Sequence, residues 1–166
     1  EGKRMAESLF TDFARLYDLE IRIARIFNTY GPRMKINDGR VISNFIVQGL
    51  TKKKLTIYGD GSQTRSFCYV DDLVKGMVRL MEEDFNLPVN LGNYQEIKIL
   101  ELAYLISKKL NLKLDFKFKE LPEDEVIKRK PSIKLAKVKL NWEPTISLNK
   151  GLDKTIDYYK TLLDKS

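Results

Sequence analysis

The sequence offers a narrow set of side chains for chemistry. It has 166 residues with no histidine and a single cysteine, Cys68, so zinc sites and histidine-based catalytic triads are excluded. Acid–base chemistry must then come from carboxylates, lysine, tyrosine or arginine. Arg65 is the arginine best placed for binding, because it follows the glycine-rich turn Gly59-Asp60-Gly61. A guanidinium can hold a diphosphate through paired hydrogen bonds, and it does not lose its charge.

A second group of polar residues, Asn28-Thr29-Tyr30-Gly31-Pro32, follows residues 20–27 (EIRIARIF). The β-branched residues of EIRIARIF predict a strand, the only one in the chain that reads as fully buried and parallel. Ligands of open α/β sheets bind at the carboxyl ends of such strands. The position favours a binding loop, with an ordinary asparagine-led turn as the alternative. Arg33, Lys35 and Arg40 flank this loop.

The elements that must position these residues alternate between helix and strand, which predicts an α/β fold. Residues 2–18 form an amphipathic helix whose apolar surface is wide enough for burial on two sides. Asp71 is expected to cap a helix, and Asp71-Asp72 therefore reads as a helix start and not as a metal site. Further helices are predicted over 41–52, 71–83, 99–110, 133–140 and 147–163, and strands over 55–58, 65–70, 89–91 and 114–118.

The net charge of +7 indicates either an anionic partner or a lysine-rich solvated surface. The basic clusters at 52–54 and 128–130 are short and lack interleaved aromatic residues, which disfavours nucleic acid. A small phosphorylated ligand fits the charge at least as well. No apolar run approaches the ~20 residues of a membrane helix, and one cysteine fits a reducing compartment. We therefore expect a cytoplasmic protein with no metal.

Five motifs now stand in order along the chain: EGKR, RIFNTYGPR, YGDGSQTRSFCYVDD, RKPSI and NWEP. Together they resemble the C-terminal half of an extended short-chain dehydrogenase/reductase of the NAD-dependent epimerase/dehydratase type, closest to its UDP-glucuronate decarboxylase (UDP-xylose synthase) branch. The resemblance implies the C-terminal part of a Rossmann-type NAD(P)-binding fold plus the small α/β nucleotide-sugar-binding domain. Residues 1–30 would complete the Rossmann core, and 31–166 would form mostly the substrate-binding lid with returning core elements.

The same resemblance implies that the N-terminal dinucleotide-binding half precedes Glu1. In the family a tyrosine stands two residues before the glutamate of EGKR, so the chain would begin between the two catalytic residues. The glycine-rich dinucleotide fingerprint would also lie upstream, since Gly59-x-Gly61 reads as a plain turn. The fragment alone is therefore expected to be inactive.

The chemistry implied by the resemblance is a decarboxylation with NAD as cofactor. NAD oxidises the sugar at C4, which places the glucuronate carboxylate β to a ketone; CO₂ leaves, and NADH reduces the intermediate to UDP-xylose. Lys3 matches the lysine that binds the nicotinamide ribose and lowers the pKa of the tyrosine. The cofactor-binding residues implied are Lys3, Thr29 and Arg40. The substrate-binding residues implied are Asn28, Arg40, Val41, Tyr58, Gln63, Arg65 and Arg129, with Arg65 also catalytic beside Lys3.

Three rival functions stay open from the sequence. A 4-epimerase or 4,6-dehydratase of the same superfamily differs at positions before Glu1, and a non-catalytic nucleotide-sugar-binding module would need no tyrosine. A nucleic-acid-binding domain rests on charge alone.

The resemblance also implies a homodimer through the helix at 2–18, with UDP-glucuronate as ligand and no contact with nucleic acid or membrane. A Golgi-type membrane anchor upstream of Glu1 stays open.

Overall fold

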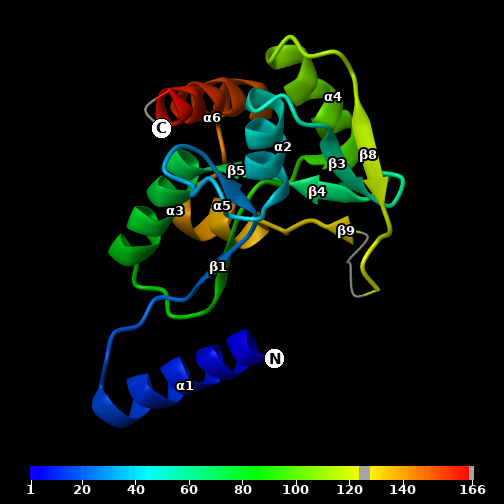
Figure 1. Ribbon diagram of the computed structural model, residues 1–166. Helices are drawn as coiled ribbons and strands as arrows, with labels where there is room; N and C mark the ends of the chain where they lie inside the picture. The colour runs from blue at the N-terminus through cyan, green and yellow to red at the C-terminus, as the bar shows by residue number, and fades with distance from the viewer. Residues whose placement is uncertain (124–127, 165–166) are drawn as a thin grey trace.

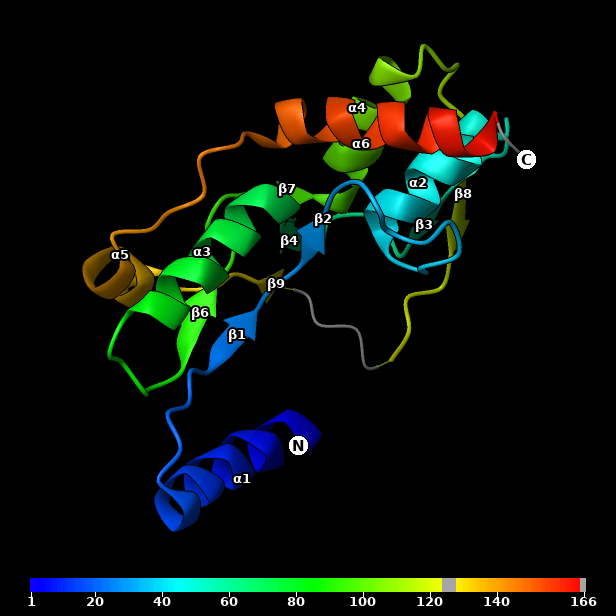
Figure 2. The same cartoon turned by 90° about the vertical axis from the view of Figure 1, so that its left-hand side faces the viewer.

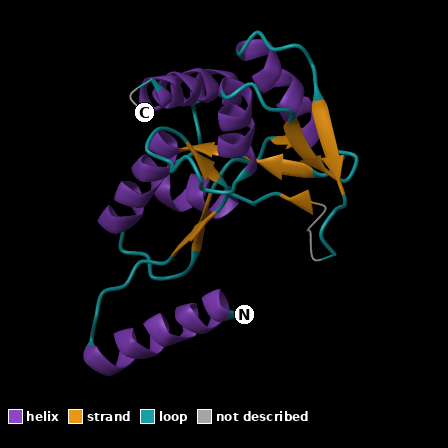
Figure 3. Ribbon diagram, viewed as in Figure 1, coloured by secondary structure: helices purple, strands orange, loops and turns teal. Residues whose placement is uncertain are grey.

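Short strands, mostly paired in parallel, alternate with helices in the computed structural model, which describes residues 1–123 and 128–164 (Figure 1, Figure 3). The helices are α1 (Gly2–Tyr17), α2 (Val41–Leu50), α3 (Val70–Glu82), α4 (Ile99–Lys109), α5 (Lys134–Leu140) and α6 (Leu148–Leu163). The strands are β1 (Ala24–Ile26), β2 (Thr29–Tyr30), β3 (Leu55–Tyr58), β4 (Thr64–Ser66), β5 (Cys68–Tyr69), β6 (Val89–Leu91), β7 (Glu96–Lys98), β8 (Phe116–Lys119) and β9 (Lys128–Arg129).

The strands pair into small sheets. Strand β1 runs parallel to β6, β2 to β5, and β3 to β8. In the three-stranded sheet the central strand β4 pairs antiparallel with β7 and parallel with β9. Parallel neighbours require crossover connections, and helices supply them here, as expected for an α/β fold.

Two hydrophobic cores form around these strands. The larger joins α2, α4 and α6 to β3 and contains Phe45, Ile57 and Tyr159. The smaller surrounds β6 and contains residues of α3 and α5 together with Trp142. Strand β5 connects the two, because Cys68 belongs to the smaller core and Tyr69 to the larger. Successive side chains of a strand point to opposite faces, so two adjacent residues can serve two cores.

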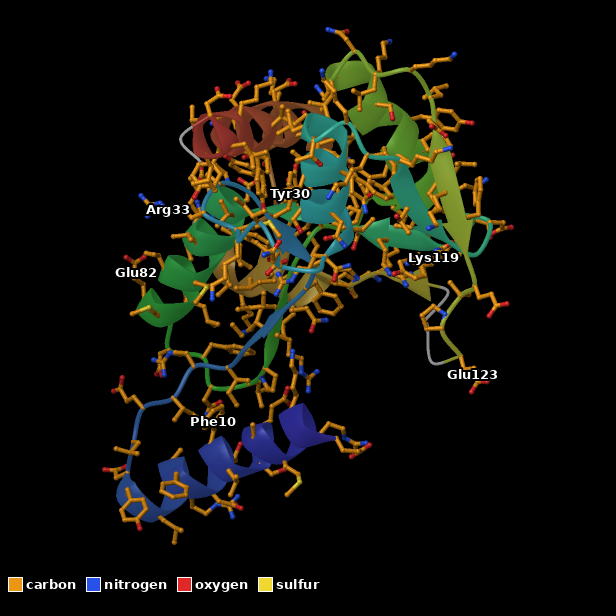
Figure 4. The ribbon with its side chains drawn as sticks, viewed as in Figure 1. Phe10, Tyr30, Arg33, Glu82, Lys119 and Glu123 are labelled. Carbon is orange, nitrogen blue, oxygen red and sulfur yellow. The ribbon has the colours of Figure 1, made fainter. Side chains whose placement is uncertain are left out.

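Helix α1 lies apart from both cores in Figures 1 and 2. None of its residues is buried, so the predicted burial on two sides is not found within the described residues. Its contact with the rest of the chain includes the ion pair between Arg25 Nη2 and Glu7 Oε2, at 2.6 Å. That hydrogen-bonded pair lowers the pKa of Glu7 and raises the pKa of Arg25. Phe10, labelled in Figure 4, is 54% exposed.

The predicted helices and several predicted strands are confirmed, and most of the differences lie in the strands. The predicted strand over 20–27 shortens to β1, which pairs only with β6 among the described strands and leaves Ile26 49% exposed. The expectation of full burial is therefore wrong. The predicted strand over 65–70 divides into β4 and β5. Strands β2, β7 and β9 were not predicted, and β2 (Thr29–Tyr30) lies within the stretch that was expected to form a loop.

The predicted cap of α3 is also wrong. Tyr69 is the N-cap residue and provides no side-chain hydrogen bond. Asp72 is buried in the first turn, where its carboxylate accepts hydrogen bonds from the backbone N–H and the hydroxyl of Thr145 and from the backbone N–H of Ile146. The indole N–H of Trp142 donates to the Asp72 carbonyl oxygen. Asp72 thus ties α3 to the segment that precedes α6.

Within the described residues, no helix is both long enough and apolar enough to span a bilayer.

Candidate functional site

A cleft of about 550 Å³ opens between the ends of β2, β3 and β4 and the N-terminus of α2. Seven of the sequence-predicted site residues line it: Asn28, Thr29, Arg40, Val41, Tyr58, Gln63 and Arg65. They come from four separate stretches of the chain, so the fold brings together what the sequence keeps apart. Their individual roles remain predictions.

One wall of the cleft is the loop that leaves β1 and enters α2. The Asn28 carbonyl oxygen accepts a hydrogen bond from the Cys68 backbone N–H at 2.9 Å, and the Thr29 hydroxyl donates to the Phe27 carbonyl at 2.9 Å. Arg40 is the N-cap residue of α2, and its carbonyl oxygen accepts from the Ser43 hydroxyl at 2.8 Å. The N-terminus of a helix carries partial positive charge, which favours an anion at this wall.

The Arg40 side chain stands at the cleft with 64% exposure, and its Nε lies 3.2 Å from Asp38 Oδ2. An arginine this accessible can exchange its carboxylate partner for a ligand at small cost, because exposed ion pairs contribute little free energy.

The opposite wall is a tight turn between β3 and β4. Gly59 and Gly61 both adopt positive φ, at 62° and 76°, which side chains with a Cβ rarely tolerate. The Gln63 amide donates to the Tyr58 carbonyl oxygen at 2.8 Å and closes the turn. Lys119 places its Nζ 5.9 Å from the centre of the Tyr58 ring, within cation–π range. The turn therefore presents one aromatic ring and one amide at the cleft.

Arg65 lies on β4 with only 7% of its surface exposed. Its Nη1 donates to the Thr64 carbonyl oxygen at 2.7 Å, which fixes the guanidinium beside the strand. Among the described residues, two arginines (Arg65 and Arg40) and no carboxylate line the cleft. A concave, partly apolar site with this charge favours an anionic ligand that also has an uncharged portion.

Two predicted site residues do not join this group. Lys3 is exposed in the first turn of α1 and does not line the cleft. Arg129 lies on β9, directly opposite Arg65 in the strand register, but its side chain falls outside the described part of the structure.

The sequence predictions missed several lining residues. Asn44 and Thr56 add polar groups, and Phe45 and Phe67 form an apolar floor with Tyr30. Tyr30 is buried beside α2 (Figure 4), its hydroxyl donates to the Leu148 carbonyl oxygen at 3.3 Å, and burial raises its pKa. Alternation along β3 could have indicated Thr56, whereas the aromatic floor depends on long-range packing.

Metal and thiol chemistry find little support in the described residues. No group of three or more carboxylates and cysteines is placed there to hold a metal ion. Cys68 is buried, and burial raises the pKa of its thiol to about 12. A thiol that stays protonated is a poor nucleophile and a poor ligand.

Comparison with known sequences gives a consistent result. The profile of the NAD dependent epimerase/dehydratase family matches residues 1–92. UDP-glucuronic acid decarboxylase 1 of Arabidopsis thaliana is 52% identical over 160 residues, and the protein of that name from Xenopus tropicalis is 48% identical over 164. These alignments cover 96% and 99% of this chain but 37% and 39% of the relatives, so the chain spans well under half their length.

Solved structures share the fold. UDP-glucose 4-epimerase of Thermotoga maritima, determined with UDP-glucose, superposes with a TM-score of 0.93 at 31% identity, covering 97% of this chain and 52% of that one. UDP-glucuronic acid 4-epimerase of Bacillus cereus, in complex with UDP-glucuronic acid and NAD, gives a TM-score of 0.86 at 32% identity, covering 94% and 50%. The α/β fold of this chain is thus that of Rossmann-type epimerase/dehydratase structures.

Proposed function

Because the chain belongs to the NAD dependent epimerase/dehydratase family, we propose that it forms the substrate-binding part of an NAD-dependent UDP-glucuronate decarboxylase, a lyase that makes UDP-xylose. The observation that carries the proposal is the composition of the cleft. Two amide side chains (Asn28 and Gln63) and two arginines (Arg40 and Arg65) line it, and no carboxylate is among the described lining residues. The choice of reaction is supported by relatives near 50% identity that bear the name UDP-glucuronic acid decarboxylase.

The charge and size of the cleft suit a nucleotide sugar. A diphosphate carries the negative charge that a buried guanidinium and a helix N-terminus attract. The apolar floor and the Tyr58 ring offer surface for a base or sugar face. In this proposal Arg65 holds either the diphosphate or the carboxylate that leaves as CO₂, since a fixed cation stabilises both. Asn28 orients the sugar from the carboxyl end of β1.

The cleft residues also fit NAD. A hydroxyl from Thr29 and an exposed guanidinium from Arg40 lie on the same wall, which matches the hydroxyl-rich and anionic groups of a dinucleotide. Bound there, NAD would supply the hydride acceptor and donor for the sugar. Thr29 and Arg40 are the residues of this chain that would hold NAD at the cleft. Lys3, on α1, does not line the cleft; its ammonium group would lower the pKa of a neighbouring catalytic base.

A 4-epimerase is the second candidate, because the solved structures that match this chain include a UDP-glucuronic acid 4-epimerase. Both reactions can start from UDP-glucuronate and NAD, so product analysis separates them. The natural protein that contains this chain should be incubated with UDP-glucuronate and NAD, and the products resolved by chromatography. Release of CO₂ with UDP-xylose supports the decarboxylase; UDP-galacturonate without CO₂ would establish the epimerase instead.

We further propose that the protein is a cytoplasmic homodimer that pairs through α1. The support for pairing is the exposed apolar surface of that helix, which includes Leu9, Phe13 and Leu16. Large exposed apolar patches commonly mark protein–protein contacts.

A further inference from the structure

The end of β8 and the residues after it are fastened to the glycine turn that follows β3. The Gly59 backbone N–H donates to the Lys119 carbonyl oxygen at 2.8 Å. The Leu121 side chain packs beside Gly59, where a Cβ added to the glycine would meet it at 3.4 Å. Pro122 follows and lines the cleft together with Tyr58. The chain that leaves β8 is therefore held at the cleft, beside the turn.

The register of the parallel β3–β8 pair determines which side chains share a face of this sheet. Tyr58 lies directly opposite Lys119, and Thr56 lies opposite Lys117. Alternate residues of a strand point to the same face, so both lysines share the face of Thr56 and Tyr58, which line the cleft. The sheet thus carries two lysines on its cleft side, and of these Lys119 is the one level with the aromatic ring.

The Lys119 ammonium lies against the Tyr58 ring. Its Nζ is 5.9 Å from the ring centre, which is a cation–π distance, and Figure 4 labels Lys119 at the end of β8. Tyr58 is 42% exposed, so burial alone does not fix its ring. An ammonium on one face restrains the ring and leaves the other face for a flat ligand group. A side chain ordered in advance avoids part of the entropy cost of binding.

We propose that Lys119 is a positioning residue for the part of the cleft that binds a nucleobase: it holds the Tyr58 ring so that a base can stack on it. Stacking suits any base, because every base has an aromatic face. That the ligand carries a base, as a UDP-sugar does, rests on the proposed function. The described residues that line the cleft do not include Lys119, so it acts through Tyr58 and not by touching the ligand.

The first test examines the contact by NMR in the natural protein without ligand. Protons that lie over an aromatic ring resonate upfield, so the Hε protons of Lys119 should resonate upfield of those of Lys117. Tyr58→Leu should remove this difference, and Tyr58→Phe should keep it. Equal shifts for the two lysines in the wild-type protein overturn the inference.

The second test measures affinity for UDP, a probe that does not require turnover. Lys119→Met keeps the length of the side chain and loses the charge, so the Kd for UDP should rise roughly threefold, the scale of an exposed cation–π contact. Lys119→Arg should retain wild-type affinity, because a guanidinium makes the same contact. Lys117→Met is the matched control: it removes an equal charge from the same face of β8, opposite Thr56, and should leave the Kd unchanged. Equal losses in the two Met variants overturn the inference.

Inorganic pyrophosphate separates positioning of the ring from attraction by charge. It carries the charge of the diphosphate but has no base to stack on Tyr58. Lys119→Met should therefore weaken the binding of UDP and leave the Kd for pyrophosphate unchanged. An equal loss of affinity for both probes would mean that Lys119 acts by its charge alone, and it overturns the inference.

Coupling to Tyr58 gives the decisive outcome. If Lys119 acts by placing the ring, then Lys119→Met adds nothing to the Kd for UDP of a Tyr58→Leu variant. Additive effects overturn the inference, as does a wild-type protein that does not bind UDP. Failure of the proposed function looks different: the NMR and UDP results would stand, while UDP-glucuronate would give no CO₂.

Discussion

Arg65 and Arg129 face each other at the same register position of the parallel β4–β9 pair, although 63 residues separate them in the sequence. Two backbone segments that each carry an arginine are thus neighbours at the wall of the cleft. The pairing is one of backbone strands, and it places the two predicted substrate-binding arginines in neighbouring strands.

The first prediction concerns Arg65. Arg65→Ala in the natural protein should weaken UDP-glucuronate binding by roughly 2–3 kcal/mol, because it removes a charge-assisted contact. Arg65→Lys should recover only part of this loss, since an ammonium lacks the planar fork. Isothermal titration measures both. Arg33→Ala is the control, because Arg33 is exposed and does not line the cleft. Wild-type affinity and turnover in Arg65→Ala would remove Arg65 from the site.

The second prediction concerns the stability of the junction between α3 and the segment before α6. Asp72→Ala leaves two backbone N–H groups and the Thr145 hydroxyl without their acceptor. The free energy of unfolding should fall by about 3 kcal/mol, the scale for a buried charged acceptor. Urea denaturation followed by circular dichroism checks this. Asp71→Ala, at an exposed position in the same turn, should change stability by less than about 0.5 kcal/mol.

The third prediction concerns pH. Burial raises the pKa of Cys68 to about 12 from an ordinary value of 9.0. The neutral thiol is therefore favoured in the folded state, and its contribution to stability is complete below pH 9. That contribution declines between pH 9 and 12, because the unfolded chain ionises first and is stabilised. Burial raises the pKa of Tyr159 as well, to about 12, and acts in the same direction.

Two measurements check the pH prediction. The free energy of unfolding from urea titrations should decrease steadily from pH 9 upward. Cys68 should react with a disulfide reagent at pH 8 only after urea unfolds the protein. Fast reaction of the folded protein at pH 8 would contradict the burial of the thiol.

The fourth prediction concerns α1. Leu9→Glu with Phe13→Glu should shift a dimer to monomer in light scattering, because both side chains lie on the exposed apolar surface of the helix. Val138→Glu on α5 is the control, since Val138 is 79% exposed at another site. A dimer that persists in the double variant places the contact elsewhere.

The helices could be predicted from the sequence because each carries its own apolar periodicity. Residues 41–52 and 147–163 show this clearly, and Ser147 caps α6 with a hydrogen bond from the Lys150 backbone N–H, as its type predicts. Asn28 and Arg65 could be assigned to a binding site because one follows a predicted strand and the other a glycine turn, whereas Gln63 came from the family resemblance; all three line the cleft.

Strands β7 and β9 could not be predicted, because their own sequences lack the alternation of apolar and polar residues that indicates a strand. Their sequences, EIK and KR, contain little apolar signal, and both form only by pairing with β4. Asp71-Asp72 correctly indicated the start of α3, but the role of Asp72 could not be predicted, because its hydrogen bonds go to residues more than seventy positions away. Such long-range pairings leave no local trace in a single sequence.

The two-residue pairing of β2 with β5 carries a mechanical consequence. Thr29 and Tyr30 lie opposite Cys68 and Tyr69 there, and Asn28 and Thr29 already belong to the cleft. Cys68 belongs to the smaller core and Tyr69 to the larger, so this short ladder carries the Asn28–Thr29 wall of the cleft at the seam between the two cores. A packing defect in either core therefore reaches this wall through the same two residue pairs.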